Sequence, residues 1–187
     1  MKPPGWLLLK YRAIALLVFG RRDAAGKVFD AMLQTFPDDA YALASRAQLA
    51  AQRGDNTAAL KDMKRLCALD GKSAHACYNY GYLLNECGQV DQAELMFKKA
   101  LELSPELDLA WYGLSLVHIH QKRLDEAVAT LGKNTQLQPM SPYGWYHLAR
   151  VHVDRKELEE ARKVIAHLRG FEPKVADQLV RETGLAA

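Results

Sequence analysis

The fold is decided by one stretch of the sequence, residues 108–141, which read DLAWYGLSLVHIHQKRLDEAVATLGKNTQLQPMS. This stretch has Trp111 near its start, Ala127 in the middle and Pro139 near its end. The next stretch, residues 142–175, has the same kinds of residue at the same offsets. Similarity at a fixed spacing indicates a repeat protein, and the same spacing extends toward the N-terminus.

Four of the seven prolines lie in one phase of a 34-residue period. The missing member of that series is Gly71, another residue that disfavours a helix. Three other positions keep their residue type in all five units: an alanine, a large apolar residue and a small residue. The prolines are Pro37, Pro105, Pro139 and Pro173; the alanines are Ala25, Ala59, Ala93, Ala127 and Ala161; the large residues are Phe29, Met63, Phe97, Leu131 and Ile165; the small residues are Ala13, Ala47, Gly81, Ser115 and Ala149.

Elementary packing explains why these residue types recur. Each unit has room for two helical stretches of about fourteen residues, called A and B below. Small residues at the eighth and twentieth positions allow the two helix backbones to approach closely, and large residues fill the space around them. Proline then ends helix B, because it has no N–H to donate and its ring clashes with the preceding turn. One helix pair cannot bury both of its faces, so we expect the units to stack.

The pattern resembles the tetratricopeptide repeat family, whose unit is W-x2-L-G-x2-Y, then A-x3-F, then P over 34 residues. Trp111 and Trp145 hold the aromatic position, Leu114 and Leu148 the leucine position, and Gly81 the glycine position. The repeats run over residues 6–39, 40–73, 74–107, 108–141 and 142–175. The resemblance implies an all-α fold, a right-handed α–α superhelix of five helix-turn-helix repeats in a single domain, residues 1–187.

The first two repeats depart from the family pattern. Arg12 and Arg46 replace the apolar seventh residue, and Gly71 replaces the proline. We therefore expect these two repeats to pack less regularly than the others.

A stack of repeats needs a polar cap at its end. Residues 174–187 are expected to supply one, because 174–184 read KVADQLVRETG. Val175 and Leu179 recur on one face of a helix there, charged residues lie on the other, and Gly184 ends it. The repeats and the cap leave no room for a second domain.

The resemblance also implies that the A helices line a concave groove, which in this family binds a partner's peptide or surface. Seven of the eight tyrosines fall at groove-facing positions. Tyrosine is enriched at interfaces because it combines a rigid apolar ring with a hydrogen-bonding hydroxyl. The residues predicted to bind the partner are Tyr41, His75, Tyr78, Asn79, Tyr82, Tyr112, Tyr143, Tyr146 and Arg150. The alternative is that the tyrosines cover the groove and pack on one another.

One specialised ligand of the family, the C-terminal carboxylate of heat-shock chaperones, is not expected. Members that bind it carry Lys and Asn in one repeat, Asn in the next, and Lys and Arg in the third. The matching positions from the first repeat are Lys10, Ile14, Ser45, His75 and Asn79, and the later registers match no better. These residues do not make a carboxylate clamp.

The first A helix is apolar on its outward side, where the other repeats are mixed. The residues of this apolar N-terminal interface are Leu7, Ile14, Leu17 and Val18. An exposed stripe of this kind usually marks an interface. Three interpretations stay open: association with a partner or a second copy, contact with a membrane protein or membrane surface, and shielding by the curvature of the chain. The basic residues around the stripe favour the second: Lys2, Lys10, Arg12, Arg21 and Arg22.

Composition argues against several other classes of protein. There are 25 Lys+Arg and 22 Asp+Glu, a net charge of +3 that is too balanced to indicate nucleic-acid binding. Three cysteines argue against a disulfide framework and favour a reducing compartment such as the cytoplasm. The uninterrupted apolar run Ala13–Phe19 is too short to span a membrane, and Lys10 and Arg12 disrupt any secretory signal.

No motif for catalysis or cofactor binding is present in the sequence. It has no P-loop, no G-x-G-x-x-G and no G-x-S-x-G. His118 and His152 share the eleventh position of adjacent repeats, but this is a packing position and would hold them too far apart to share a metal ion. The cysteines, Cys67, Cys77 and Cys87, form no C-x-x-C pair. We expect no enzyme, no cofactor and no metal site.

The sequence therefore predicts a non-catalytic scaffold, adaptor or assembly factor that binds a partner's peptide or helix in its groove. The alternative is a membrane-recruited assembly factor that docks through its apolar N-terminal helix. The two hypotheses differ in whether the tyrosines of the groove or the leucines of the first helix are needed for binding.

Overall fold

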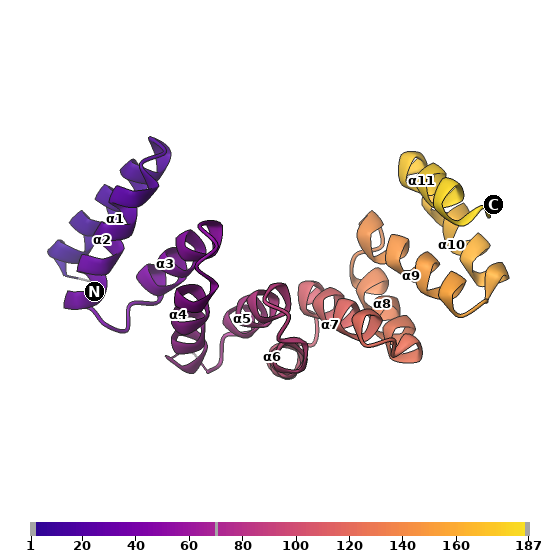
Figure 1. Cartoon of the computed structure of the whole chain (residues 1–187), viewed down its shortest axis with the longest axis horizontal. Coiled ribbons are helices and arrows are strands. Elements are labelled where there is room, and N and C mark those ends of the chain that lie inside the picture. The colour runs from indigo at the N-terminus through magenta and orange to yellow at the C-terminus, as the bar shows by residue number, and fades with distance from the viewer. Residues whose placement is uncertain (1–2, 70, 186–187) are drawn as a thin grey trace.

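The computed structural model describes residues 3–69 and 71–185, and within these residues every regular element is a helix. Eleven helices follow one another along this part of the chain. Their bounds are α1 Pro4–Val18, α2 Arg22–Thr35, α3 Ala40–Gln52, α4 Asn56–Leu69, α5 Ala74–Glu86, α6 Val90–Leu103, α7 Asp108–His120, α8 Leu124–Leu137, α9 Pro142–Asp154, α10 Leu158–Arg169 and α11 Pro173–Thr183. Together they form an arc with the two termini at opposite ends (Figure 1).

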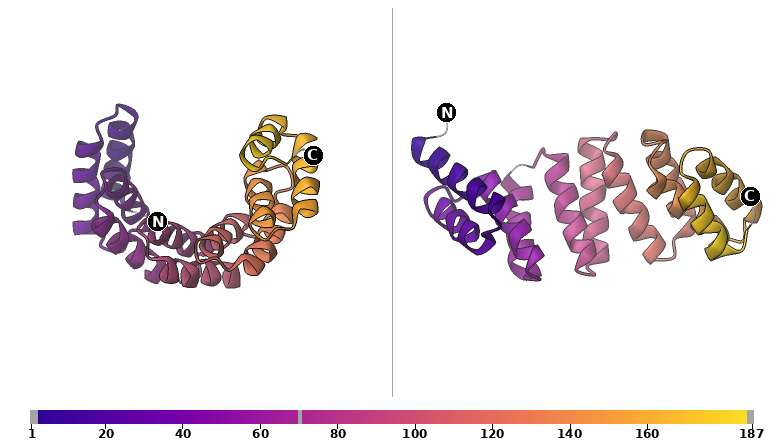
Figure 2. Two further views of the ribbon diagram at one scale, coloured as in Figure 1. Left: turned by 45° about the vertical axis from the view of Figure 1, so that its right-hand side comes forward. Right: turned by 90° about the horizontal axis from the view of Figure 1, so that it is seen from above.

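The helices are arranged as stacked pairs, and the expected all-α repeat superhelix is confirmed. Each pair contacts the next through its second helix, so that α2 packs on α3, α4 on α5, α6 on α7 and α8 on α9. First helices of neighbouring repeats also touch where α5 meets α7. In the middle of the arc α3 and α5 lie on its inner side and α4 and α6 on its outer side (Figure 1). The left view of Figure 2 shows the arc again, and the view from above shows the helix pairs following one another in a row.

Close approach of the two helices in each pair is visible in the burial of the small residues. The five alanines at the twentieth position have no exposed surface, and all five residues at the eighth position are buried. The large residue at the twenty-fourth position is fully buried in four repeats, as Phe29, Phe97, Leu131 and Ile165. In the second repeat it is Met63, which is only half-buried. The second repeat, one of the two in which the sequence departs from the pattern, therefore buries this one position less completely than the others.

Tryptophan at the fourth position joins a repeat to the one before it. Trp111 Nε1–H donates to the carbonyl oxygen of Pro105 at 2.7 Å, and Trp145 Nε1–H donates to that of Pro139 at 2.9 Å. Each proline follows the end of a B helix by two residues. It therefore lies in the inter-repeat turn and also presents a carbonyl oxygen to the next repeat.

Arg46, which replaces an apolar residue, is accommodated by paired carboxylates. Its Nε and Nη2 donate to the two carboxylate oxygens of Asp62 at 2.7 and 2.8 Å, and its Nη1 donates to Asp30 at 2.9 Å. Asp62 is 4% exposed, so this bidentate pair satisfies a charge that burial would otherwise penalise. These hydrogen bonds, that to Asp62 first, raise the pKa of Arg46 above its usual value. Asp30 belongs to α2, so Arg46 also connects the first repeat to the second.

Similar contacts cross other junctions. In each of them the basic or amide side chain, at the fourteenth position, comes from the later repeat and the aspartate from the start of the preceding B helix. They are Arg53 to Asp23 at 2.6 Å, Gln121 to Asp91 at 2.9 Å and Arg155 to Asp125 at 3.0 Å. At each of these junctions, the later repeat therefore supplies the donor and the earlier repeat supplies the acceptor.

The cap begins at Pro173, one residue before the expected boundary. This proline starts α11 and does not end α10, which already ends at Arg169. Proline is favoured in the first turn of a helix because its missing N–H has no intrahelical partner there. Leu179 is fully buried against the last repeat, and Gly184 ends the helix with a φ of 70°, in the left-handed region.

The close helix approach is testable at two glycines. A Cβ on Gly113 would lie 2.6 Å from ring atoms of Phe97, which is buried and also in close contact with Gly81. We expect Gly113→Ala to lower the free energy of unfolding by about 1–3 kcal/mol in urea titrations. Gly132→Ala is the matched control, because it lies inside α8 with no atom within 4 Å of the added Cβ. It should raise the same quantity by roughly 0.5–1 kcal/mol. Equal effects would contradict the packing described here.

Candidate functional site

The inner side of the arc carries a row of aromatic rings, which we call the aromatic row: Tyr82, Tyr78, Tyr112, His147 and Tyr146. Tyr82 and Tyr78 lie one turn apart on α5 with ring centroids 6.4 Å apart. His147 on α9 lies 5.7 Å from Tyr112 on α7 and 5.4 Å from Tyr146. The structure therefore brings together aromatic residues from three consecutive repeats.

Burial affects the pKa of three residues of the row. It is the main cause of the raised pKa values of Tyr78 and Tyr112, so both phenols are uncharged at neutral pH. It is also the main cause of the lowered pKa of His147, with the Arg150 guanidinium contributing in the same direction. These three side chains are thus neutral groups that can form hydrogen bonds.

Part of this surface is open to solvent. Tyr82 is 50% exposed and Tyr143, beside the row on α9, is 69% exposed. His75 and Asn79 on α5 are exposed as well. Some tyrosine rings therefore contact one another, as the alternative interpretation expects, while Tyr82 and Tyr143 face solvent, so binding of a partner stays a prediction.

A hollow of about 450 Å³ adjoins the row between α3 and α5. Its polar lining comes from Ser45, Gln48 and Asn79, and Tyr82 and the half-buried Met63 add apolar surface. The hollow thus includes the one large packing residue of the series that is not fully buried. Its two carboxamides could each donate to and accept from a peptide backbone.

At the fifth repeat, residues of the aromatic row and its neighbour Arg150 contact the cap helix α11. Tyr146 Oη–H donates to Glu182 at 2.6 Å, and Arg150 lies 3.4 Å from the same carboxylate oxygen. Arg150 also lies over the Tyr146 ring, 5.8 Å from its centroid. Hydrogen bonds, that from Tyr146 first, lower the pKa of Glu182. Two residues predicted to contact a partner are therefore engaged by the cap, which sequence periodicity did not indicate.

Tyr41 lies apart from the row, near the first repeat. Its ring packs edge-on against Trp6 and Phe29, with centroids 6.4 and 5.9 Å away. The Lys10 ammonium lies 4.9 Å from the Tyr41 centroid and 5.1 Å from that of Trp6. This ring is therefore mainly a packing residue between α1 and α3.

The apolar N-terminal residues lie on α1 and are unevenly exposed. Leu7 is 42%, Leu17 36% and Val18 76% exposed, whereas Ile14 is half-buried. Other exposed apolar residues of this region, not singled out from the sequence, are Leu8 at 72%, Tyr11 at 65% and Phe19 at 79%. None of the helices in the described ranges is both long and apolar enough to cross a membrane.

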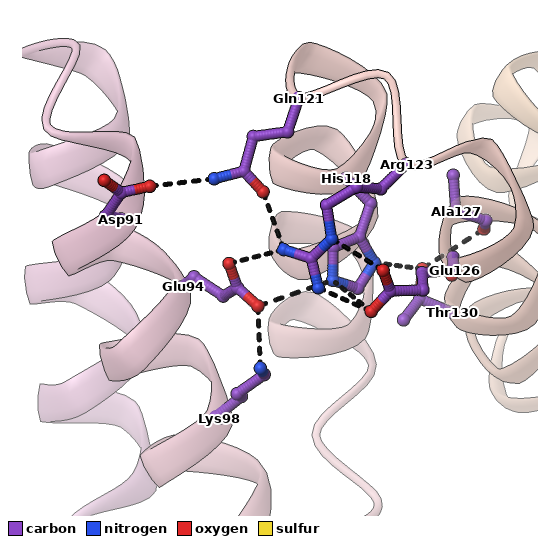
Figure 3. Close-up of polar contacts among 9 residues, drawn as sticks. All are labelled: Asp91, Glu94, Lys98, His118, Gln121, Arg123, Glu126, Ala127 and Thr130. Atoms are coloured by element: carbon purple, nitrogen blue, oxygen red, sulfur yellow. Dashed lines mark hydrogen bonds and ion pairs between the residues drawn. The ribbon is translucent and has the colours of Figure 1, made fainter.

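His118 lies at the junction of the third and fourth repeats in a cluster of charged residues (Figure 3). Its Nε2 is 3.8 Å from Glu94 and 3.9 Å from Glu126, beyond hydrogen-bonding distance, while Arg123 pairs with both carboxylates. The hydrogen bond from Arg123 is the main cause of the lowered pKa of Glu94, about 2. Within residues 3–69 and 71–185 no group of three or more His, Cys, Asp or Glu is placed to hold a metal ion. The cluster is therefore an ion-pair network around a buried imidazole.

Comparison with known proteins gives two matches to family models. Residues 12–74 match the tetratricopeptide repeat model, and residues 86–168 match that of anaphase-promoting complex, cyclosome, subunit 3. A relative from Caenorhabditis elegans, "Cell division cycle protein 27 homolog", is 38% identical over 68 residues, 36% of this chain. The chain spans about a tenth of that relative, since the match covers 9% of its length.

Several solved structures share the whole arc. MamA 41-end from Desulfovibrio magneticus RS-1 superposes with a TM-score of 0.79 at 17% identity, over 99% of this chain and all of the other. YrrB has a TM-score of 0.75 at 16% identity over 90% and 88% of the two chains, and PilW 0.79 at 18% identity over 98% and 88%. These likenesses define the class, a helical-repeat solenoid. The match of residues 12–74 assigns that part of the chain to the tetratricopeptide repeat family, and the solved structures show that the same fold extends along the rest of the described residues.

The buried imidazole predicts a pH dependence of stability. Burial, with Arg123, lowers the pKa of His118, and the carboxylates of Glu94 and Glu126 oppose this only in part. Below pH ~6.5 the unfolded chain therefore binds a proton that the folded chain does not. The free energy of unfolding consequently decreases as the pH is lowered. We expect His118→Leu to make the decline between pH 7.5 and pH 5.5 shallower, because leucine does not titrate.

Chemical denaturation at a series of pH values measures this effect. The variant should keep part of the dependence of its unfolding free energy on pH, because His147, whose pKa is also lowered mainly by burial, is still present. The variant should also be about 1 kcal/mol more stable at pH 7.5, because His118 Nε2 is buried without a hydrogen bond to any described residue. Thr130 keeps its bonds to the carbonyl oxygens of Glu126 and Ala127. An unchanged slope would contradict the assignment.

Proposed function

We propose that this chain is a non-catalytic scaffold that binds an extended or helical segment of a partner protein along the aromatic row and the adjoining hollow. The observation that supports this most is the exposure of Tyr82 and Tyr143 on the inner side of the arc. Rigid aromatic side chains provide binding energy at low entropic cost, because little conformational freedom is lost when they are covered.

The hollow between α3 and α5 suits a peptide backbone. Gln48 and Asn79 line opposite sides of it and each carries a donor and an acceptor. The Tyr82 ring would cover an apolar side chain of the bound segment. At the other end the cap engages Tyr146 and Arg150, so the binding surface is centred on α3, α5 and α7.

The similar proteins agree with such a role. The structure of YrrB is described as that of a tetratricopeptide repeat protein with an unusual peptide-binding site, and PilW as a type IV pilus biogenesis factor. One family model is named for subunit 3 of the anaphase-promoting complex, and the curated relative is a homolog of cell division cycle protein 27. A peptide-binding site is named for YrrB, and the partner of this chain follows from none of these descriptions.

The groove is tested by combining Asn79→Ala with Tyr82→Ala. A peptide selected from a random library on the immobilised wild-type chain is titrated calorimetrically against both proteins. We expect the double variant to bind it at least about tenfold more weakly, a loss of ~1.4 kcal/mol or more, because an aromatic contact and an amide pair are removed together.

The matched control is Leu95→Ala, which removes an apolar side chain that is 63% exposed on α6. It should bind the peptide as the wild type does. If the selected peptide binds equally well to the double variant and the wild type, the groove proposal is wrong.

A second candidate function is recruitment to a membrane surface through α1. It is supported by the exposure of Val18 and Phe19, 76% and 79%, near basic residues. Apolar and basic side chains together favour adsorption to anionic lipid. We expect the chain to sediment with phosphatidylglycerol vesicles, and Leu17→Glu with Val18→Glu to lower the bound fraction several-fold. Leu95→Glu is the control, and equal sedimentation of all three proteins excludes this function.

A further inference from the structure

The end of the array before α1 has an open face that the groove does not use. It is a hollow of about 290 Å³ between α1 and α2. Leu9, Leu16 and Val28 supply its apolar lining, and the three charged side chains around it are Arg12, Arg21 and Lys27, all basic and exposed. In Figure 1 this helix pair forms one extremity of the arc. Within the described residues no helix packs before α1.

The junctions inside the array show what such a face binds. Each A helix packs against the B helix of the preceding repeat, and basic residues of the later repeat pair with acids of that B helix. Arg46 donates to Asp30 at 2.9 Å across the first junction, and Arg123 donates to Glu94 at 2.7 Å across the third. The acceptor in both cases comes from the earlier repeat.

The same two basic positions recur on the open face. Arg12 holds the position in the first repeat that Arg46 holds in the second, and Arg21 holds the position that Arg123 holds in the fourth. Arg12 also lacks the acid that Arg46 finds in its own repeat, since Val28 stands where the second repeat has Asp62. Neither Arg12 nor Arg21 has an ion pair with a residue in 3–69 or 71–185.

The acids that would complete these pairs have a defined spacing. Glu94 is the twenty-first residue of its repeat and Asp30 the twenty-fifth of its own, so the two positions are four residues apart on a B helix. Residues four apart lie on the same helical face. A helix docked on α1 in the manner of the internal junctions would therefore present two carboxylates one turn apart, beside an apolar stripe.

We propose that this end of the array binds an amphipathic helix of another protein that carries two acidic residues four positions apart. Leu9, Leu16 and Val28 would contact its apolar face, and Arg12 and Arg21 would each pair with one carboxylate. The exposed Lys27 adds a third positive charge that favours association with an acidic segment. This surface is distinct from the aromatic row, and the proposal does not depend on the groove.

A second copy of this chain does not fit the face. None of its B helices has an acid at both positions: the pairs are Gly26 and Asp30, Leu60 and Lys64, Glu94 and Lys98, Val128 and Gly132, and Arg162 and Ala166. Two copies meeting end to end through this face would place Arg12, Arg21 and Lys27 against the same residues, and like charges in contact are unfavourable. The other end of the array is covered by α11.

The test uses a helical peptide with the sequence of residues 90–103 in which Lys98→Asp supplies the second acid. A hydrocarbon staple on its polar face keeps it helical, and a fluorophore reports binding to the full-length chain by anisotropy. We expect saturable binding that weakens with salt. A peptide with glutamine at both acidic positions should bind at least about tenfold more weakly.

Charge reversal identifies the site. Arg12→Glu with Arg21→Glu should abolish binding of the acidic peptide, and a peptide with lysine at both positions should bind this variant in preference to the wild type. Lys133→Glu on α8 is the control for net charge and should bind the acidic peptide with little change. The groove variant Asn79→Ala with Tyr82→Ala should bind the acidic peptide as the wild type does. Failure of this proposal can therefore be distinguished from failure of the groove proposal.

Several results would overturn the proposal. Equal binding of the acidic and glutamine peptides, or of the wild type and the charge-reversed variant, would show that Arg12 and Arg21 do not select the ligand. A wild-type dimer in light scattering that the reversal dissociates would assign the face to a second copy. Sedimentation with phosphatidylglycerol vesicles that the reversal abolishes, without peptide binding, would assign it to a membrane.

Discussion

The whole array depends on the contact between small residues of paired helices. Because alanine, glycine or serine stands at the eighth position and alanine at the twentieth, the A and B backbones approach closely and large side chains fill the flanking space. This fixes the geometry of each pair, and stacking identical geometries produces the arc. Phe97 shows how little space is left, since a Cβ would lie 3.0 Å from its ring at Gly81 and 2.6 Å from it at Gly113.

The junctions between repeats are more varied than the pairs. Tryptophan to carbonyl bonds join the later repeats, arginine to carboxylate pairs join the first two, and the second and third meet at buried thiols, with Cys67 Sγ 3.1 Å from Cys77 Sγ. The charged junctions between repeats have one direction, with the base on the later repeat, whereas at the cap the bases lie on the fifth repeat and the acids on α11. In the first repeat Arg12 and Arg21 hold the positions of two such bases and have no ion pair within residues 3–69 and 71–185, so they define the ligand proposed for this face.

The inner side of the arc combines packing and exposure in the same residues. Tyr78 and Tyr112 are partly buried, and the ring of Tyr78 lies 6.4 Å from that of the exposed Tyr82. A bound segment would therefore meet rings that already pack against their neighbours. The half-buried Met63 of the second repeat lines the hollow beside the row. The packing position that is least completely buried therefore adjoins the candidate site.

The sequence by itself determined the repeat, the helix pairs, the small and large packing positions and the face on which the tyrosines lie, because all of these follow from spacing along one chain. Only the tertiary structure decided which charges meet, since Arg46 with Asp62 and Tyr146 with Glu182 join different helices at distances that no periodicity specifies. It also showed that the cap engages Arg150, and that Arg12 and Arg21 stay unpaired among the described residues. Periodicity specifies direction from a helix axis, whereas the partner of a side chain depends on how neighbouring helices are placed in space.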